Sequence, residues 1–282
     1  IIFPELSLTG YPPEDWLFRV EFRERVEHAL KNLQENIGDI YAIVGHPVWQ
    51  NSKCFNAASV IHQGKIITQC FKQFLPNYGI FDEKRYFTPG HESCVFEINN
   101  VKIGLLICED LWWPGPWKQV VDKGAQCIIA PKASPFERHK SEQREAIIRE
   151  RQRTEGAIPL IYVHGVGGQD ELVFDGQSFA MNAEGEVCWR AKAFEPDEHL
   201  ISFPLDFRII QSLTLPSEEA LLYKALVLGV RDYVYKNGFK GALLGLSGGI
   251  DSALVLAIAV DALGADAVEA VMMPSRYTAT MS

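Results

Sequence analysis

The chain has 282 residues, with 27 Lys and Arg against 36 Asp and Glu, which gives a formal net charge of −9 at pH 7. This length suits one large or two ordinary domains, and the acidic balance argues against a nucleic-acid partner because no basic, aromatic cluster offsets it. The longest apolar stretch, residues 253–260, is much too short to span a membrane.

Residues 1–205 alternate short β-rich runs with a few amphipathic helices. Turn residues such as Gln63-Gly64 and Asn99-Asn100 separate neighbouring runs and indicate hairpins. Many strands mixed with helices favour a layered α/β sandwich. The expected strands cover residues 41–45, 58–61, 65–69, 95–98, 101–107, 127–130, 160–163, 179–182 and 187–190, with a helix expected over 141–156.

The pattern changes after Phe203-Pro204. Ser217 and the two following glutamates predict the N-cap and acidic first turn of a long helix that runs to Asn237 and ends at Gly238. A buried strand, a helix and a second strand then follow as one βαβ unit of a Rossmann-like, doubly wound parallel sheet. Their expected ranges are 241–246, 252–263 and 268–273.

We therefore expect a first domain over residues 1–205, a linker over 206–216 and a second domain over 217–282. The chain begins within an expected strand and stops soon after another one. We expect natural sequence to be missing on both sides.

The cysteines are widely separated and form no Cys-x-x-Cys pair, so the sequence predicts neither a zinc site nor a disulfide framework. Reduced thiols in a cytoplasmic protein fit this spacing best. The six are Cys54, Cys70, Cys94, Cys108, Cys127 and Cys188.

Cys108 ends the apolar run VKIGLLIC and is followed at once by Glu109-Asp110, so it lies where a buried strand meets polar surface. This position suits a nucleophile, but a lone cysteine after an apolar strand is more often a buried structural residue. No His lies in a Cys-His protease motif, so another base is required. Glu5 and Lys72 each follow an expected strand and offer a carboxylate and an amine, although each alone also fits a surface salt bridge.

The segments FPELSLTGYPPED, CFKQFLPNYGIFDEKRYF and ICEDLWWP together resemble the nitrilase, or carbon–nitrogen hydrolase, family over most of residues 1–205. The resemblance implies the α-β-β-α sandwich of that family, with Glu5, Lys72 and Cys108 converging on one amide carbon. The Cys108 thiolate would attack, Glu5 would transfer the proton, and Lys72 with the Glu109 N–H would hold the oxyanion. Glu83 would orient Lys72.

Within this family the segments are most similar to the glutaminase domains of NAD⁺ synthetases. By that similarity Ser134 and Lys140 hold the α-amino and α-carboxylate groups of glutamine. Relatives commonly have Arg in place of Lys140, and Lys cannot form the same bidentate pair with a carboxylate. Residues 174–176 also match the family pattern, but equally fit a tight surface turn. The glutamine-binding residues implied are Tyr78, Glu83, Glu109, Ser134 and Lys140.

The segment LLGLSGGIDSAL places a glycine turn between the expected strand and an apolar helix. Glycines let backbone N–H groups approach phosphate oxygens, and the helix N-terminus and serine hydroxyls add further donors. The turn is neither a Walker A loop nor a G-x-G-x-x-G turn, and a chance glycine turn is the alternative. It resembles the loop of ATP pyrophosphatases, which cleave ATP between the α and β phosphates and transfer AMP.

By this second resemblance Asp251 binds Mg²⁺, which prefers carboxylate, phosphate and water oxygens. Arg276 would lie near ATP, although a solvated loop arginine explains it equally well. The ATP-binding residues implied are Gly245, Leu246, Ser247, Gly248, Gly249, Ile250, Asp251, Ser252, Met273 and Arg276.

Together the resemblances imply a carbon–nitrogen ligase whose glutaminase supplies ammonia and whose second domain adenylates and amidates deamido-NAD⁺. Glutamine, ATP with Mg²⁺ and deamido-NAD⁺ would be substrates, with no tightly bound organic cofactor. Two alternatives stay open: the same sites with an acceptor that yields GMP, asparagine or argininosuccinate-like products, and a regulatory or scaffold module with relic sites. We also expect a homo-oligomer, although no pattern specifies the number of subunits.

Overall fold

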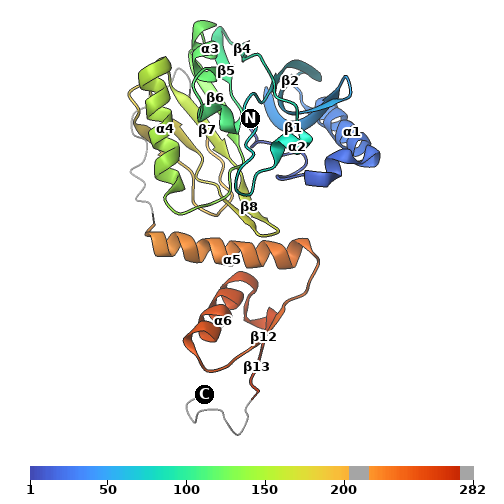
Figure 1. Cartoon of the computed structure of the whole chain (residues 1–282), viewed down its shortest axis with the longest axis vertical. Coiled ribbons are helices and arrows are strands. Elements are labelled where there is room, and N and C mark those ends of the chain that lie inside the picture. The colour runs from blue at the N-terminus through green and yellow to red at the C-terminus, as the bar shows by residue number, and fades with distance from the viewer. Residues whose placement is uncertain (203–215, 274–282) are drawn as a thin grey trace.

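The computed structural model describes residues 1–202 and 216–273. Figure 1 shows a large body at the top, the long helix α5 (Glu218–Lys236) beneath it, and a small unit containing α6 (Ile250–Leu263) at the bottom. The expected linker, except for Pro216, and Arg276 lie outside the described residues.

Two sheets form the body. The smaller is antiparallel and joins β1 (Ala42–Gln50), β2 (Lys53–His62) and β3 (Lys65–Phe71). The larger has the order β11-β10-β7-β6-β5-β4, and its strands β5, β6 and β7 are parallel, so their carboxyl ends meet at one edge. Its strands are β4 (Cys94–Ile98), β5 (Val101–Leu105), β6 (Cys127–Lys132), β7 (Leu160–His164), β10 (Phe179–Met181) and β11 (Val187–Arg190).

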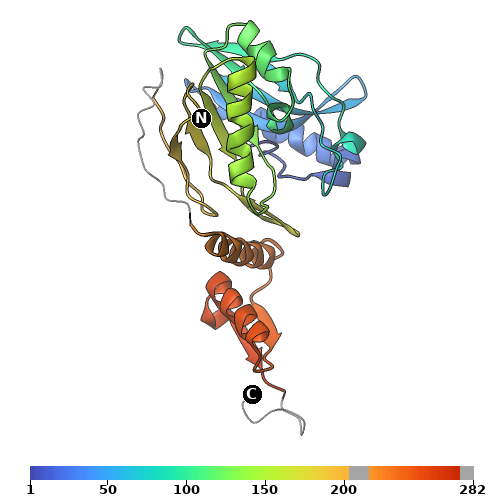
Figure 2. The same cartoon turned by 60° about the vertical axis from the view of Figure 1, so that its left-hand side comes forward.

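Helices cover the outer faces of both sheets (Figures 1 and 2). Helix α1 (Val20–Asn36) packs its leucines on β1, whereas α3 (Pro116–Asp122) and α4 (Lys140–Glu155) pack on the larger sheet. Apolar side chains from both sheets, among them Val60 and Leu105, form a dry layer between them. The expected α-β-β-α sandwich is confirmed.

The expected strands of this body are all present, but β1 and β2 extend well beyond the predicted ranges of 41–45 and 58–61. Pro47 obscures the strand pattern in β1, although residues 46–50 pair with β2 in regular register. The sequence reading missed the hairpin of β8 (Val166–Gln169) and β9 (Leu172–Asp175) because consecutive glycines in β8 weaken its strand pattern. Asp175 is only 1% exposed, so the surface-turn alternative for residues 174–176 is wrong.

Helix α5 docks on that hairpin. Asp232 of α5 accepts a hydrogen bond of 2.7 Å from the Gly168 N–H. An added Cβ at Gly168 would lie 3.1 Å from the Asp232 side chain, so glycine permits the close approach. Leu228 and Phe194 belong to the apolar cluster beside this contact. The second part of the chain is therefore packed directly against the first.

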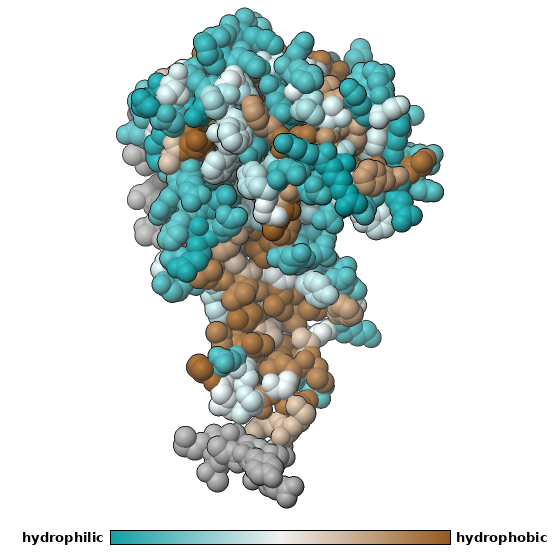
Figure 3. Space-filling view, viewed as in Figure 1, coloured by the Kyte–Doolittle hydropathy of each residue, from teal (hydrophilic) through white to brown (hydrophobic). Residues whose placement is uncertain are grey.

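The small unit contains one parallel βαβ arrangement, as predicted, from β12 (Ala242–Gly245) through α6 to β13 (Val268–Val271). Ser217 caps α5 by accepting from the Ala220 N–H at 3.3 Å, which confirms the predicted helix start. The expected burial of the first strand is wrong, because Leu243 is 69% exposed. One side of the unit packs on α5, whereas Figure 3 shows apolar side chains gathered on the surface of this region. The short elements that complete the described chain are the 3₁₀ helices η1 (Glu14–Phe18), η2 (Cys108–Leu111) and η3 (Ala265–Ala267), and α2 (Glu83–Tyr86).

Candidate active site

Lys72, immediately after β3, lies between two carboxylates. Its Nζ is 2.7 Å from Glu5 Oε1 and 2.8 Å from Glu83 Oε1, and all three residues are buried. Burial alone lowers the pKa of Lys72, but the two carboxylates raise it well above the usual value. Lys72 is therefore held as an ammonium, and the structure brings together Glu5, Lys72 and Glu83.

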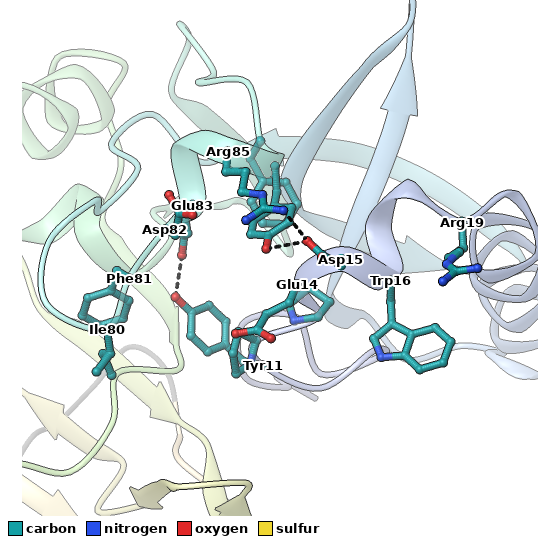
Figure 4. Close-up of a pocket in the computed structure, with 14 residues that line it drawn as sticks. Tyr11, Glu14, Asp15, Trp16, Arg19, Ile80, Phe81, Asp82, Glu83 and Arg85 are labelled. Atoms are coloured by element: carbon teal, nitrogen blue, oxygen red, sulfur yellow. Dashed lines mark hydrogen bonds and ion pairs between the residues drawn. The ribbon is translucent and has the colours of Figure 1, made fainter.

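Glu83 stands at the first turn of α2. The Tyr11 hydroxyl donates to Glu83 Oε1 at 2.8 Å, and Figure 4 shows these two side chains pointing toward each other beside a cavity of about 460 Å³. Burial raises the pKa of Glu83 to about 7, against the opposing charge of Lys72. One of the two carboxylates on Lys72 thus takes up a proton near neutral pH.

Glu5 is fixed by contacts from distant parts of the chain. Its Oε1 accepts from Asn56 Nδ2 at 2.8 Å in addition to Lys72, and its Oε2 accepts from the Ala133 N–H at 3.0 Å. The sequence reading missed both donors. No local pattern identifies Asn56 or Ala133, because they lie 51 and 128 residues from Glu5.

Cys108 lies just past the carboxyl end of β5 and begins η2. Its φ of 47° is in the left-handed region, which is uncommon for residues other than glycine. Burial raises the pKa of the Cys108 thiol to about 12, and Glu5 adds to this rise while Lys132 and Lys72 oppose it. The thiol is therefore protonated at neutral pH, and a base must remove its proton during attack.

Asp110 fixes the turn that carries Cys108. Its Oδ1 accepts from the N–H groups of Gln73 and Phe74, both at 2.9 Å, and its Oδ2 accepts from the Ile107 N–H at 3.1 Å. These bonds tie the segment after Lys72 to the nucleophile turn. The sequence marked Asp110 as a polar neighbour but gave it no role, because its partners are backbone groups.

Tyr78 and Glu109 meet at a more open part of the site. The Tyr78 hydroxyl lies 3.1 Å from Glu109 Oε1, which also accepts from Trp113 Nε1 at 3.1 Å. Tyr78 is 53% exposed, whereas Glu109 is buried. The structure therefore brings two predicted glutamine-binding residues together, with Tyr78 on the solvent side.

Ser134 lies in a second buried charged cluster. Arg144 Nη1 donates to both Asp175 oxygens at 2.9 Å, and its Nη2 donates to Ser134 Oγ at 3.2 Å. His164 Nε2 lies 2.9 Å from Ser134 O. Burial and the nearby Arg144 lower the pKa of His164 to about 3, so its ring is neutral. The sequence reading missed Arg144 because a charged helix such as α4 is ordinarily solvated.

Lys140 does not join this cluster. Its Nζ lies 3.2 Å from Glu137 Oε2 and 5.2 Å from the centre of the Trp112 ring. The structure places Arg144, not Lys140, against Ser134.

The glycine loop precedes α6 and is exposed. Gly248 has a φ of 80°, Ser247 Oγ lies 3.1 Å from Ser252 Oγ, and Ser252 Oγ donates to Gly249 O at 2.9 Å. Met273 lies beside Gly245, since an added Cβ there would lie 3.3 Å from the Met273 methyl carbon. The described part of the predicted ATP set is therefore arranged around one strand-to-helix turn.

No cluster of three or more His, Cys, Asp or Glu residues suited to a metal ion occurs within the described ranges, so Asp251 would be a solitary carboxylate ligand. No helix within residues 1–202 or 216–273 is long and apolar enough to cross a membrane.

A buried cysteine subject to the charges of a carboxylate–lysine–carboxylate set, within an α-β-β-α sandwich, is the arrangement of the nitrilase class. The family profile of carbon-nitrogen hydrolases matches residues 1–213, and the chain belongs to this family. A second profile, NAD synthase, matches residues 222–282.

Similar proteins support both assignments. The chain is 46% identical to the glutamine-dependent NAD(+) synthetase of Xylella fastidiosa, aligning over 100% of the chain and 53% of that relative. It is 39% identical to the enzyme of the same name from Aquifex aeolicus, over 100% of the chain and 56% of the relative. The chain spans about half the length of these curated relatives.

A solved glutamine-dependent NAD⁺ synthetase from Acinetobacter baumannii, in complex with ADP, has a TM-score of 0.94 and 41% identity. The match covers 100% of this chain and 54% of that one. An amidase from Nesterenkonia sp. AN1 has a TM-score of 0.60 and 24% identity over 70% of this chain and 76% of its own, which supports the fold alone.

Proposed function

We propose that this chain carries the glutaminase site and the opening part of the ATP site of a glutamine-dependent NAD⁺ synthetase. The observation that carries the glutaminase assignment is the buried set of Glu5, Lys72 and Glu83, whose charges act on Cys108, a residue with a φ of 47°. The similarity to synthetases along the whole chain supports deamido-NAD⁺ as the acceptor over the other acceptors considered.

In this proposal the Cys108 sulfur attacks the side-chain amide carbon of glutamine while Glu5 accepts the thiol proton. Glu5 then delivers that proton to the departing ammonia, which leaves a thioester on Cys108. Glu5 next takes a proton from water, the resulting hydroxide attacks the thioester, and the Cys108 thiol and glutamate are released.

Lys72 stabilises the oxyanion in both steps. Two of its three donor hydrogens face Glu5 and Glu83, so one is left for the substrate oxygen. The Glu109 N–H supplies the second donor, while Tyr78 and the Glu109 carboxylate line the substrate entrance. Ser134 and Lys140 hold the α-groups of glutamine, and Arg144 positions Ser134.

The loop over residues 245–252 holds ATP phosphates at the N-terminus of α6, with Met273 and Arg276 beside it. Asp251 lies in the first turn of α6, exposed and able to contribute one oxygen to Mg²⁺. Since Asp251 is a solitary carboxylate among the described residues, phosphate and water oxygens would supply the other ligands. The metal would neutralise phosphate charge while AMP is transferred to deamido-NAD⁺.

The cytoplasmic location, the homo-oligomer, the absence of a tightly bound organic cofactor and the boundaries 1–205, 206–216 and 217–282 stay predictions. The glutaminase proposal does not depend on any of them, because its side chains all lie within residues 1–202.

The test uses full-length protein with Cys108→Ala. We expect no NAD⁺ from glutamine, ATP and deamido-NAD⁺, because losing a covalent nucleophile removes the whole pathway. With ammonium salts in place of glutamine, NAD⁺ formation should be nearly normal, and mass spectrometry of the products measures both. A folded variant that is inactive with both nitrogen sources contradicts the two-site proposal, and one that is active with both excludes Cys108 as the nucleophile.

A further inference from the structure

Lys132 is the last residue of β6 and is 1% exposed. Its Nζ donates to the main-chain carbonyl of Cys108 at 2.7 Å. The same ammonium lies 5.7 Å from the centre of the Trp112 ring and 5.5 Å from that of Tyr162. A second buried lysine therefore contacts the nucleophile residue itself.

This ammonium has no acidic partner within the described ranges. The other buried cations are paired: Lys72 with two carboxylates, Arg144 with Asp175 and Arg190 with Glu145. Lys132 instead has one carbonyl oxygen and two aromatic faces. An unpaired buried charge is costly, and aromatic faces recover only part of that cost. A lysine kept in this position without a structural ion pair points to a role in the adjacent site.

The charge balance of the site indicates that role. Glu5 and Glu83 both oppose formation of a thiolate at Cys108, and Lys72 offsets only part of their charge. The Lys132 ammonium adds a second positive charge that favours the thiolate. Lys132 also donates to the main-chain carbonyl of Cys108, whose φ is 47°. One side chain therefore holds the strained backbone of Cys108 and places a positive charge near its sulfur.

We propose that Lys132 is a positioning residue: its ammonium holds the Cys108 main chain in place and stabilises the thiolate that forms there during attack on an amide. The proposal rests on the proposed role of Cys108 as nucleophile. Transfer of the thiol proton to Glu5 leaves a negative charge on sulfur, and this charge passes to the amide oxygen as the carbon–sulfur bond forms.

Several charged groups besides Lys132 act on the Cys108 thiol. Burial and Glu5 raise the pKa of Cys108. Lys132 and Lys72 lower it, and the effect of Lys132 is the larger of the two. The Lys132 ammonium lies over the ring of Tyr162 and acts electrostatically on the neutral His164. The titratable or charged groups that act on Cys108 are Glu5, Tyr11, Lys72, Tyr78, Glu83, Lys132, Arg144 and Tyr162.

The experiment measures the rate of Cys108 alkylation by iodoacetamide against pH, with peptide mapping to identify the cysteine. In full-length Lys132→Met, which keeps a long unbranched side chain but loses the charge, the rising part of the pH profile should shift by about one unit toward higher pH. At a fixed pH on that rising part the rate should fall about tenfold. An unchanged profile in the folded variant overturns the proposal.

Two further variants separate charge from packing. Lys132→Gln keeps a hydrogen-bond donor without the charge, and we expect the same upward shift; a wild-type profile would overturn the electrostatic role. Lys123→Met is the matched control, because Lys123 Nζ also donates to a main-chain carbonyl, that of Ser93, at 2.9 Å. Its Cys108 profile should match wild type, and a shift equal to that of Lys132→Met would show that the effect is not specific to Lys132.

Labelling also distinguishes this proposal from the proposed function. If a glutamine-mimicking electrophile labels another cysteine of the wild-type protein ahead of Cys108, the nucleophile assignment itself fails. If Cys108 is labelled first and the Lys132 variants keep its pH profile, only the role of Lys132 is lost.

Discussion

The buried site around Cys108 and the glycine loop differ in how their polar groups are arranged. Around Cys108 the charged groups are buried and already bonded to one another, as in the contacts of Lys72 with Glu5 and Glu83. The loop at Gly248 is exposed, and its bonds are short-range contacts between serine hydroxyls and the backbone. Covalent attack requires charges fixed before the substrate arrives, whereas a phosphate loop needs donors that stay accessible.

The difference predicts that side-chain changes at the nucleophile site have large effects on rate. In full-length Lys72→Ala, glutamine hydrolysis should fall about 10²–10³-fold, because one oxyanion donor is lost. Steady-state ammonia release measures this effect, with circular dichroism as the check on folding. The control is Lys84→Ala, an exposed lysine on α2, which should retain wild-type activity. Near-normal hydrolysis in a folded Lys72→Ala would remove Lys72 from the mechanism.

Buried ion pairs should also contribute more to the free energy of unfolding than exposed ones. Asp175→Asn weakens the bidentate contact with Arg144 and leaves that guanidinium without a counter-charge. We expect a loss of about 2 kcal/mol in the free energy of unfolding, less than the roughly 3–5 kcal/mol for removing a partner outright, because the amide oxygen still accepts. Urea denaturation measures it. The control Glu195→Gln, in an exposed pair with Lys224, should cost less than about 1 kcal/mol, and equal losses would refute the contrast.

The sequence predicted these two regions unequally, for physical reasons. Glu5, Lys72 and Cys108 could be predicted, because a charged or reactive residue directly after an apolar run is a pattern within a short stretch of sequence. The residues that hold Glu5 in place, Asn56 and Ala133, act across long sequence separations and leave no local pattern. The exposure of β12 could not be predicted either, because an apolar run indicates a buried strand whether or not another element packs against it.

The acidity of the buried site gives a pH-dependent prediction. Because the pKa of Glu83 rises from 4.5 in the unfolded chain to about 7 in the folded one, its contribution to stability is greatest below pH 4.5. That contribution is lost as the pH rises toward about 7. Glu83→Gln lacks this titration, so its stability relative to wild type should improve steadily over that window. Urea denaturation at several pH values measures the difference, and a constant difference between the two proteins would refute the raised pKa.

The smallest stability effect is expected in the loop, where function and folding should separate. Gly248 has a φ of 80°, and an alanine there should cost about 1 kcal/mol in backbone strain. Because the loop is exposed, the fold should tolerate this loss, but strain in the turn should misdirect the N–H groups meant for ATP phosphates. Full-length Gly248→Ala should therefore show weaker ATP-dependent pyrophosphate release while glutamine hydrolysis persists.

Gly238→Ala is the matched control, since Gly238 has a φ of 72° after α5 with no atom close to an added Cβ. It should lose similar stability, measured by thermal unfolding, yet keep pyrophosphate release. If both variants lose pyrophosphate release equally, general destabilisation explains the effect and the loop assignment loses its support; if Gly248→Ala keeps full release, the loop does not hold ATP.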